Sequence, residues 1–136
     1  MLENFIGKSQ MAAILSYCKG EEGEFYRAML EKLENQIATM PKTYETDGQG
    51  EAAFATLHYF YGGSDWWIVE KDEGSPDDTL QGQQLQAFGF ACLNGDKENA
   101  ELGYINIEEL ISNGVELDLY YTPQTIGAIM ERLGKL

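Results

Sequence analysis

The turn residues GGSD at 62–65 separate two segments that are rich in aromatic and β-branched residues. The segment AFATLHYFY at 53–61 and the segment DWWIVEK at 65–71 both have the composition of β-strands. A short glycine-rich turn between two such segments predicts an antiparallel β-hairpin. This hairpin limits the fold to one that contains a sheet with at least one strongly apolar face.

Trp66 and Trp67 are adjacent in the second segment, and neighbouring side chains of a strand point to opposite faces. We therefore expect one of them to lie in the core. The other either joins Tyr59 or Tyr61 of the facing strand in an exposed aromatic patch, or is covered by helices. Because exposed Trp and Tyr side chains often anchor protein interfaces, the first alternative predicts a binding surface on the hairpin.

Three further segments have the pattern of strands. QLQAFGFACL at 84–93 and AELGYI at 100–105 flank the turn NGDKEN. VELDLYY at 115–121 alternates apolar and polar residues, as a strand does when one face is buried and the other faces water. Glu116 and Asp118 lie on its polar face. Together with the hairpin, these segments predict a mainly antiparallel sheet of about five strands.

The N-terminal part predicts a helical hairpin. Apolar residues recur at helical spacing between Ser9, which can cap a first helix, and Gly20, which can end it. A second apolar stripe runs over residues 21–40 and stops at Pro41. The polar segment 41–52, which contains two glycines, is typical of a linker.

Two further helices are predicted in the C-terminal half. In NIEELISNG at 106–114, Asn106 can cap the start of a helix and Gly114 follows its end. Thr122 can cap a last helix that has Pro123 at its first position. Short helices at these places would flank the strand predicted between them.

The order of these elements predicts an α+β protein. We expect a mainly antiparallel sheet of about five strands, covered on one side by helices. Residues 1–42 would form an N-terminal helical hairpin that extends a core domain of residues 43–136. The acidic stretch at 72–83 is predicted to be a loop between two strands.

The negative charge of the chain is concentrated in its middle. Residues 1–42 contain six acidic and five basic residues, and residues 123–136 contain one acidic and two basic residues. Residues 43–122 contain sixteen acidic residues, with Lys71 and Lys97 as their only bases, and the formal net charge of the chain is −14. Such a surface repels nucleic acid and anionic membranes and attracts basic proteins. We therefore expect a basic protein partner and no direct binding to nucleic acid or membrane.

No segment predicts export or insertion into a membrane. The start MLENFIGKSQ lacks the basic beginning and the apolar core of a signal peptide. No apolar run approaches the roughly 20 residues that span a bilayer. Cys18 and Cys92 belong to no CxxC pair, which indicates reduced core thiols. We expect a cytoplasmic protein.

Motifs for catalysis or cofactor binding are missing from the sequence. His58 is the single histidine, no GxSxG motif accompanies it, and we interpret it as a packed side chain. One histidine and two separate cysteines do not make a zinc site, and no glycine-rich loop leads into a helix as a phosphate site needs. DEGSPDD at 72–78 and GDKENAE at 95–101 do not match a calcium loop of the EF-hand kind. We expect no cofactor and no metal.

Carboxylate pairs are the remaining candidates for chemistry. Glu70 and Asp72 are two residues apart on one predicted strand, and so are Glu116 and Asp118 on another. Each pair shares a face of its strand, so two pairs on adjacent strands could bind Mg²⁺ or Mn²⁺ or act as acid and base. The alternative is an ordinary solvated sheet face, which strand alternation produces by default.

Four stretches resemble a family of small bacterial proteins of unknown function that occur on plasmids, integrative elements and phages. The stretches are SDWWIVEKD, QAFGFACLNGD, AELGYINIEEL and VELDLYYTP, and the resemblance covers residues 54–133. The family pattern matches this chain at Trp67, Glu70, Asp72, Phe88, Gly89, Glu101, Leu102, Gly103, Tyr104, Glu116 and Asp118. Where the family has an arginine between the last two acids, this chain has Leu117, which removes a positive charge from the candidate cluster.

The resemblance implies a protein of a mobile genetic element and brings no established activity. Small acidic proteins of such elements resemble inhibitors of host defence, including those that imitate DNA, because an acidic protein can occupy the basic groove of a nuclease. We therefore hypothesise a non-enzymatic acidic interaction protein that inhibits a nucleic-acid-binding host defence protein. Its contact surface would combine acidic and aromatic side chains, namely Trp66, Trp67, Glu70, Asp72, Glu101, Tyr104, Glu116 and Asp118.

Two alternative functions remain open at this point. A metal-dependent hydrolase would use the carboxylates of Glu70, Asp72, Glu101 and Asp118. A dimerising regulatory module would pair the N-terminal helical hairpin with that of another copy.

Overall fold

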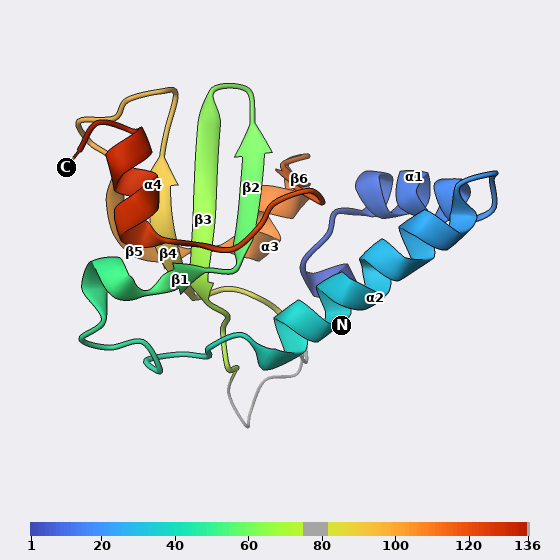
Figure 1. The fold of residues 1–136 in the computed structure, drawn as a ribbon, viewed down its shortest axis with the longest axis horizontal. Coiled ribbons are helices and arrows are strands. Elements are labelled where there is room, and N and C mark those ends of the chain that lie inside the picture. Colours follow the sequence, from blue (N-terminus) through green and yellow to red (C-terminus); the bar gives the residue numbers. More distant parts are fainter. Residues whose placement is uncertain (75–81, 136) are drawn as a thin grey trace.

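The computed structural model describes residues 1–74 and 82–135, and most of the loop predicted at 72–83 lies outside them. The fold is α+β, as predicted, with a five-stranded antiparallel sheet and an N-terminal helical hairpin (Figure 1). The helices are η1 (Leu2–Asn4), α1 (Lys8–Cys18), α2 (Gly23–Thr39), η2 (Gly50–Ala52), α3 (Ile107–Ser112) and α4 (Ile126–Arg132). Within the described ranges, no helix has the length and apolar character that crossing a membrane requires.

The strands are β1 (Phe54–Ala55), β2 (Leu57–Tyr61), β3 (Ser64–Glu70), β4 (Ala87–Cys92), β5 (Glu101–Ile105), β6 (Glu116–Leu117) and β7 (Gln124–Thr125). The main sheet has the order β5-β4-β3-β2-β6, so β5 and β6 form its two edges. β2 and β3 make the predicted hairpin, in which Tyr61 faces Ser64 across Gly62 and Gly63. Gly62 has a φ of 56°, a left-handed conformation that favours glycine in such a turn. β1 and β7 form a separate two-stranded pair.

Helices cover both faces of the sheet, whereas the sequence predicted cover on one side. A first core joins the sheet to the N-terminal helices and α3, and its largest buried members are Phe5, Ile6, Ile14, Ile37, Leu57, Tyr59, Ile68, Ile107 and Leu117. A second core lies under α4 and contains Trp67, Val69, Phe90, Cys92, Ile126 and Ile129. In Figure 1, α4 lies in front of the sheet and α3 behind it. The segment 115–121, whose alternation predicted a solvent-exposed face, lies at an edge of the sheet and not at its centre.

The helical hairpin of α1 and α2 projects beyond the β6 edge of the sheet (Figure 1). Its base packs into the first core through Ile14, Leu33 and Ile37, so residues 1–42 share that core with the sheet. α1 begins at Lys8 with Gly7 as its N-cap, two residues before the predicted cap Ser9. α2 begins at Gly23, and a Cβ at this position would clash with the carbonyl oxygen of Cys18.

The ends of the two C-terminal helices differ in how well they were predicted. Asn106 caps α3 as expected, with its side chain accepting a hydrogen bond of 2.9 Å from the N–H of Glu109. The last helix does not start at Pro123, because Gln124–Thr125 first pair with β1. Thr125 then caps α4, and its hydroxyl oxygen accepts from the N–H of Ala128 at 3.2 Å.

The strand predicted over residues 115–121 is shorter in the structure. Only Glu116–Leu117 pair with β2, facing Phe60 and Tyr59. The Asp118 side chain accepts a hydrogen bond of 3.0 Å from the N–H of Tyr120, which turns the chain away from the sheet. This local turn ends the strand even though the alternating pattern continues.

Candidate functional site

The two tryptophans lie on opposite faces of β3, but neither forms an exposed patch. Trp67 is only 5% exposed and belongs to the second core, while Trp66 is half-buried against the first. Tyr59 is also fully buried, and its hydroxyl donates to the carbonyl of Phe5 at 2.6 Å. Trp67 is therefore the tryptophan that lies in the core, whereas Trp66 is only partly covered, so the structure shows neither a fully exposed tryptophan nor complete cover of both. Tyr61, at the end of β2, is exposed.

Glu70 was expected on the contact surface, yet it is 4% exposed. Its carboxylate accepts hydrogen bonds from the N–H groups of Tyr44 (2.8 Å) and Thr46 (2.9 Å), and from the Thr46 hydroxyl. A β-bulge between Ile68 and Glu70 shifts the register of the strand at this point. Glu70 therefore fastens the segment around Thr46 to the sheet and offers no oxygen to a partner.

Asp72 also has an internal role. Its carboxylate accepts hydrogen bonds from the N–H groups of Gly74 (2.8 Å), Leu85 (3.2 Å) and Gln86 (3.0 Å). The buried Gln84 side chain accepts from the Asp72 N–H at 2.7 Å. These contacts close the base of the loop that follows β3, so Asp72 is a loop anchor.

The carboxylates of the hydrolase alternative do not converge. Glu70 and Asp72 face backbone N–H groups, and Glu101 lies on β5, at the sheet edge opposite to Asp118. Across residues 1–74 and 82–135, no group of three or more His, Cys, Asp or Glu side chains could hold a metal ion. The geometry therefore gives no support to a metal-dependent reaction at these residues.

The remaining predicted residues are divided between the two edges of the sheet. Glu101 and Tyr104 are exposed on β5. Glu116 is exposed on β6, and Asp118 follows it. The sequence had placed all of them on one surface, but strand order puts β5 and β6 at opposite ends of the sheet.

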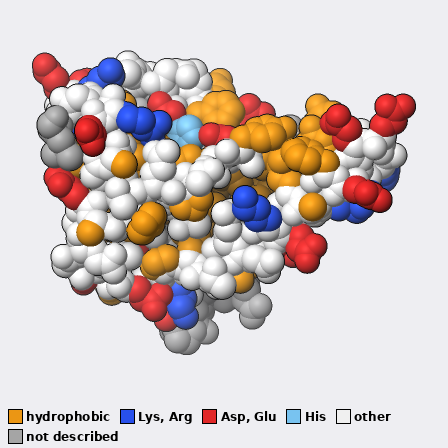
Figure 2. Space-filling model, viewed as in Figure 1, with side chains coloured by type: hydrophobic (Ala, Val, Ile, Leu, Met, Phe, Trp, Pro, Cys, Tyr) orange, Lys and Arg blue, Asp and Glu red, His pale blue; other side chains and the backbone are white. Residues whose placement is uncertain are grey.

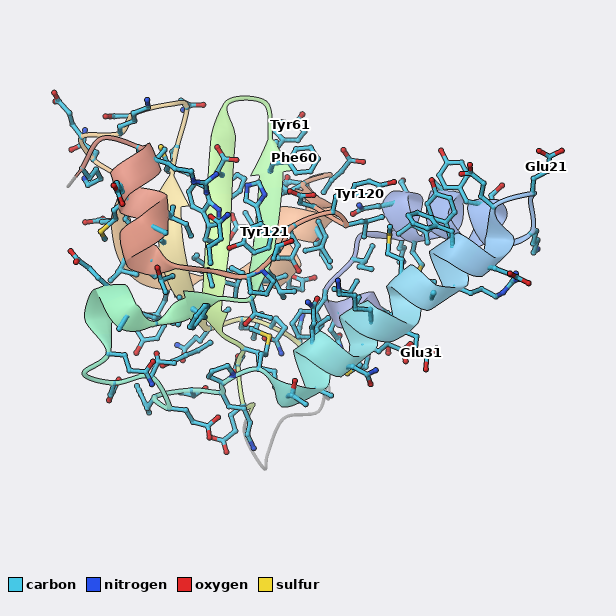
Figure 3. The ribbon with its side chains drawn as sticks, in the orientation of Figure 1. Glu21, Glu31, Phe60, Tyr61, Tyr120 and Tyr121 are labelled. Atoms are coloured by element: carbon cyan, nitrogen blue, oxygen red, sulfur yellow. The ribbon has the colours of Figure 1, made fainter. Side chains whose placement is uncertain are left out.

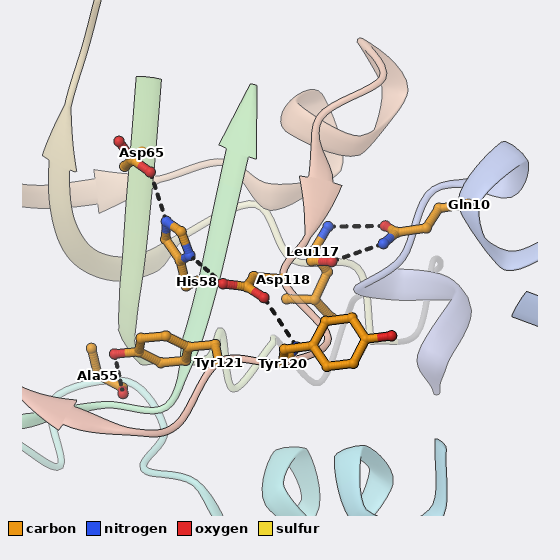
Figure 4. Close-up of polar contacts among 8 residues, drawn as sticks. All are labelled: Gln10, Ala55, His58, Asp65, Leu117, Asp118, Tyr120 and Tyr121. Carbon is orange, nitrogen blue, oxygen red and sulfur yellow. Dashed lines mark hydrogen bonds and ion pairs between the residues drawn. The ribbon is translucent and has the colours of Figure 1, made fainter. Parts of the chain in front are cut away.

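His58 connects the strands next to the β6 edge. Its Nδ1 lies 3.0 Å from a carboxylate oxygen of Asp118, and its Nε2 lies 2.7 Å from one of Asp65 (Figure 4). The ring stacks on Trp67 at a centroid distance of 5.2 Å and an angle of 16°. Both ring nitrogens face carboxylates, so neither is free to take a proton from a nucleophile. His58 is a packed side chain, as the sequence indicated, and it holds two acidic residues in place.

Several bonds fix the segment 117–121 (Figure 4). Gln10 bonds both the N–H and the carbonyl of Leu117, at 2.9 and 2.8 Å. Asp118 is held by His58, and the Tyr121 hydroxyl donates to the carbonyl of Ala55 at 3.0 Å. Burial raises the pKa of Tyr121 to about 12. Tyr120, between these anchors, is 68% exposed, so an aromatic side chain is presented from a well-fixed backbone.

Aromatic side chains continue from Tyr120 in both directions. On the side of the helical hairpin, hydrogen bonding with Tyr120 raises the pKa of Tyr26. The centroid of the Tyr26 ring lies 5.0 Å from that of Tyr17 and 5.2 Å from that of Phe25. Toward the sheet, Phe60 stacks near His58 at 6.0 Å. We call this region the Tyr120 surface, and its members are Tyr17, Phe25, Tyr26, Phe60, Tyr61, Tyr120, Asp65, Glu116 and Asp118.

The figures show how the Tyr120 surface is arranged. In Figure 3, Phe60 and Tyr61 lie at the end of β2, and Tyr120 lies between them and the helical hairpin of α1 and α2. In Figure 2, hydrophobic side chains run from the sheet toward the hairpin, with acidic side chains among and beyond them. Phe60 pairs across the strands with Glu116 on one side and Asp65 on the other. Phe60 is therefore flanked by an acidic residue on each side, in a row that crosses β3, β2 and β6.

Few carboxylates of the described residues are neutralised by a cationic side chain. The ion pairs there are the N-terminal amine with Glu3 and the two contacts of His58, and none involves lysine or arginine. Several cations bond backbone carbonyls instead: Lys71 donates to Ile37 (2.6 Å), Lys135 to Ala100 (3.0 Å) and Arg27 to Cys18. Exposed carboxylates such as Glu116 thus have no lysine or arginine partner among the described residues.

The sequence pointed to an acidic and aromatic surface but named few of its aromatic residues. Tyr120 could have been found, because it lies on the polar side of the alternating segment at 115–121. Tyr17 and Tyr26 could not, since only the turn between α1 and α2 brings them together. Comparisons of the chain with protein-family models, curated protein sequences and solved structures find no match.

Proposed function

We propose that this chain is a non-enzymatic acidic interaction protein and that the Tyr120 surface binds a basic protein. The observation that carries the proposal is the absence of lysine and arginine from every ion pair in the described residues. Carboxylates without a lysine or arginine partner attract a basic surface over a long range, and fixed, exposed aromatic residues supply the short-range contact. Because the backbone around Tyr120 is already held, little ordering is needed on binding.

The class of partner that fits best is a nucleic-acid-binding protein. Such proteins have positively charged grooves that are shaped to receive a polyanion. An acidic protein of net charge −14 would occupy the groove and exclude nucleic acid. The sequence motifs resemble those of proteins from bacterial mobile genetic elements. In the cytoplasm of such a host, the partner would be a host defence protein.

The test compares the unmodified chain with Tyr120→Ala and with Tyr44→Ala as a matched control. Tyr44 is also an exposed tyrosine, at 64% against 68%, but lies outside the Tyr120 surface. Proteins captured from a bacterial lysate at low salt are identified, purified and titrated against all three chains. We expect a basic protein whose binding weakens with salt and falls about tenfold or more for Tyr120→Ala but not for Tyr44→Ala.

A competition experiment then tests the nucleic-acid groove. Duplex nucleic acid added to the complex should displace the chain from its partner. A basic partner that binds the chain and nucleic acid at the same time would remove the mimicry part of the proposal. Equal affinities of Tyr120→Ala and Tyr44→Ala would remove the Tyr120 surface as the binding site.

A further inference from the structure

Within residues 1–74 and 82–135, nothing pairs with the outer side of the edge strand β5. β5 bonds only β4, and no described residue hydrogen-bonds the backbone of Glu101–Ile105 from the other side. The opposite edge differs, because the amide of Gln10 occupies the outward N–H and carbonyl of Leu117 on β6. An open edge strand of this length is a template for pairing with another strand. The described part of the fold thus blocks one edge of the sheet and leaves the other open.

Apolar side chains accompany this open edge. Leu102 and Tyr104 are 36% and 60% exposed, and they pair across the strands with Phe90 and Phe88. Tyr104 packs edge-on against Phe88, with ring centroids 5.8 Å apart. Alternation along the strand places Leu102 and Tyr104 on the same face. The apolar surface of the second core therefore continues outward to the last strand and is not covered there.

We propose that two copies of this chain pair through β5, antiparallel and about a two-fold axis at Gly103, to form one continuous sheet. In this register Leu102 lies opposite Tyr104 of the second copy, so each exposed apolar side chain meets the other. Glu101 lies opposite Ile105, which keeps like charges apart within the strand pair. The interface is self-complementary, as a two-fold dimer requires.

The charges at the two ends of β5 favour a second copy as the occupant. Just before the strand, Lys135 is bonded to the carbonyl of Ala100 at 3.0 Å. Just after it, α3 carries Glu108 and Glu109 in its first turn. Antiparallel pairing brings the start of one β5 beside the end of the other, so this lysine approaches these acids twice in the dimer and offsets their repulsion by Glu98 and Glu101 at the strand start. An unrelated extended peptide would have no such matched ends.

The dimer edge lies at the opposite end of the sheet from β6 and the Tyr120 surface. The pairing of copies and the binding of a basic protein therefore use different residues. A substitution in β5 is expected to change the oligomeric state without changing affinity for a basic partner, so the two proposals can fail separately.

Disulfide trapping gives the sharpest test of the register. A Cβ added at Gly103 meets no atom within 4 Å, so Gly103→Cys leaves the fold undisturbed. In the proposed dimer the two introduced thiols lie directly opposite each other, at a spacing that suits a disulfide. The matched control is Glu101→Cys, whose thiols would be about 13 Å apart along the paired strands. Both are made with Cys18→Ser, while Cys92 stays, since it is 3% exposed and burial raises its pKa.

We expect mild oxidation to link Gly103→Cys into a dimer and to leave Glu101→Cys monomeric. Sedimentation over a concentration series should show a reversible dimer of the unmodified chain, weakened about tenfold or more by Leu102→Lys. Circular dichroism and the melting temperature of each variant check that it is folded. Partner binding through the Tyr120 surface should be unaffected by Leu102→Lys.

Three outcomes overturn the proposal. If the chain is monomeric at all concentrations, β5 does not pair with a second copy, and its open edge would instead accept a strand of another protein. Equal crosslinking of Gly103→Cys and Glu101→Cys would show that the register is wrong. A dimer that survives Leu102→Lys but is lost in Leu15→Lys would assign self-association to the helical hairpin, where Leu15 is 50% exposed.

Discussion

Gln10 and Leu117 are joined by a pair of hydrogen bonds that resembles the pairing of neighbouring strands. The Gln10 side-chain NH₂ donates to the Leu117 backbone carbonyl at 2.8 Å, and the Leu117 N–H donates to the Gln10 side-chain oxygen Oε1 at 2.9 Å. A side chain of α1 thereby satisfies the outward backbone groups of an edge strand. The same contact connects the helical hairpin to the sheet.

Replacing Gln10 by alanine should destabilise the protein by about 1–2 kcal/mol, because two backbone groups of Leu117 lose their partner. Lys8→Ala is the control, since Lys8 lies on the same helix and is exposed. Urea unfolding followed by circular dichroism measures both. A Gln10→Ala chain as stable as Lys8→Ala would mean that water replaces the amide without cost.

Glu70→Gln should destabilise the protein by about 2 kcal/mol. The substitution removes a charge that accepts several hydrogen bonds and turns an amide NH₂ toward backbone donors. The exposed Glu73→Gln serves as the control. Denaturant unfolding of the two variants, with limited proteolysis near Thr46, checks the prediction. If the two variants are equally stable, Glu70 does not anchor this segment.

Gly89 and Gly103 face each other on β4 and β5, yet their replacement by alanine should have opposite consequences. A Cβ at Gly89 would clash with the carbonyl oxygen of Trp67, which is backbone and cannot move aside. We expect Gly89→Ala to lose about 3 kcal/mol or more and Gly103→Ala to stay within about 0.5 kcal/mol of the parent. Thermal melting of both proteins decides the matter, and similar melting temperatures would contradict the packing at Gly89.

The buried Tyr59 and the partly buried Tyr121 should ionise late in an alkaline titration. Burial raises the pKa of Tyr121 to about 12 and raises that of Tyr59 further still. Because a raised pKa means that the neutral form is favoured in the folded state, Tyr121 stabilises the fold fully below about pH 10, its unfolded value. That contribution is lost as the pH rises through about 12.

Tyrosinate absorbance during the titration measures this effect, and Tyr121→Phe is the matched variant. It should lack the step near the pKa of Tyr121. A parent protein whose tyrosines all ionise together, with the fold still intact, would contradict the burial of Tyr59 and Tyr121.

His58 and Asp118 should be energetically coupled. In a double-mutant cycle with His58→Ala and Asp118→Ala, we expect a coupling of about 0.5–1 kcal/mol, reduced by the partial exposure of the carboxylate. Urea unfolding of the four chains gives the value. Strict additivity would show that the 3.0 Å contact contributes nothing to stability.

Much of the fold follows from local sequence signals. The hairpin around Gly62, the apolar stripe of α2 and the cap at Asn106 are each encoded within a few neighbouring residues. The segment 115–121 was misread for a local reason as well. Alternation predicts a full strand there, but the Asp118 side chain bonds the N–H of Tyr120 and ends the pairing after Leu117.

The candidate site depends on contacts that no local pattern reveals. Glu70 is buried because Thr46 and Tyr44, which lie 24 and 26 positions earlier in the chain, donate hydrogen bonds to its carboxylate. A bulge in β3 turns the side chain toward them. His58 meets Asp118, 60 residues later, only because β2 lies between β3 and β6. The sequence therefore indicated the kinds of residue that a binding surface would use, while strand order decided which of them share an edge.

A sheet that is walled in on both sides by packed helices has only its perimeter left to vary. Substitutions on the flat sides of β3 and β4 would disturb one interior or the other. Substitutions that leave the fold intact are therefore expected mainly at the edges, on β5, on β6 and on the projecting helices. Among descendants of this protein, the sequence should therefore stay constant on the central strands β3 and β4 and vary on the edge strands and the projecting helices.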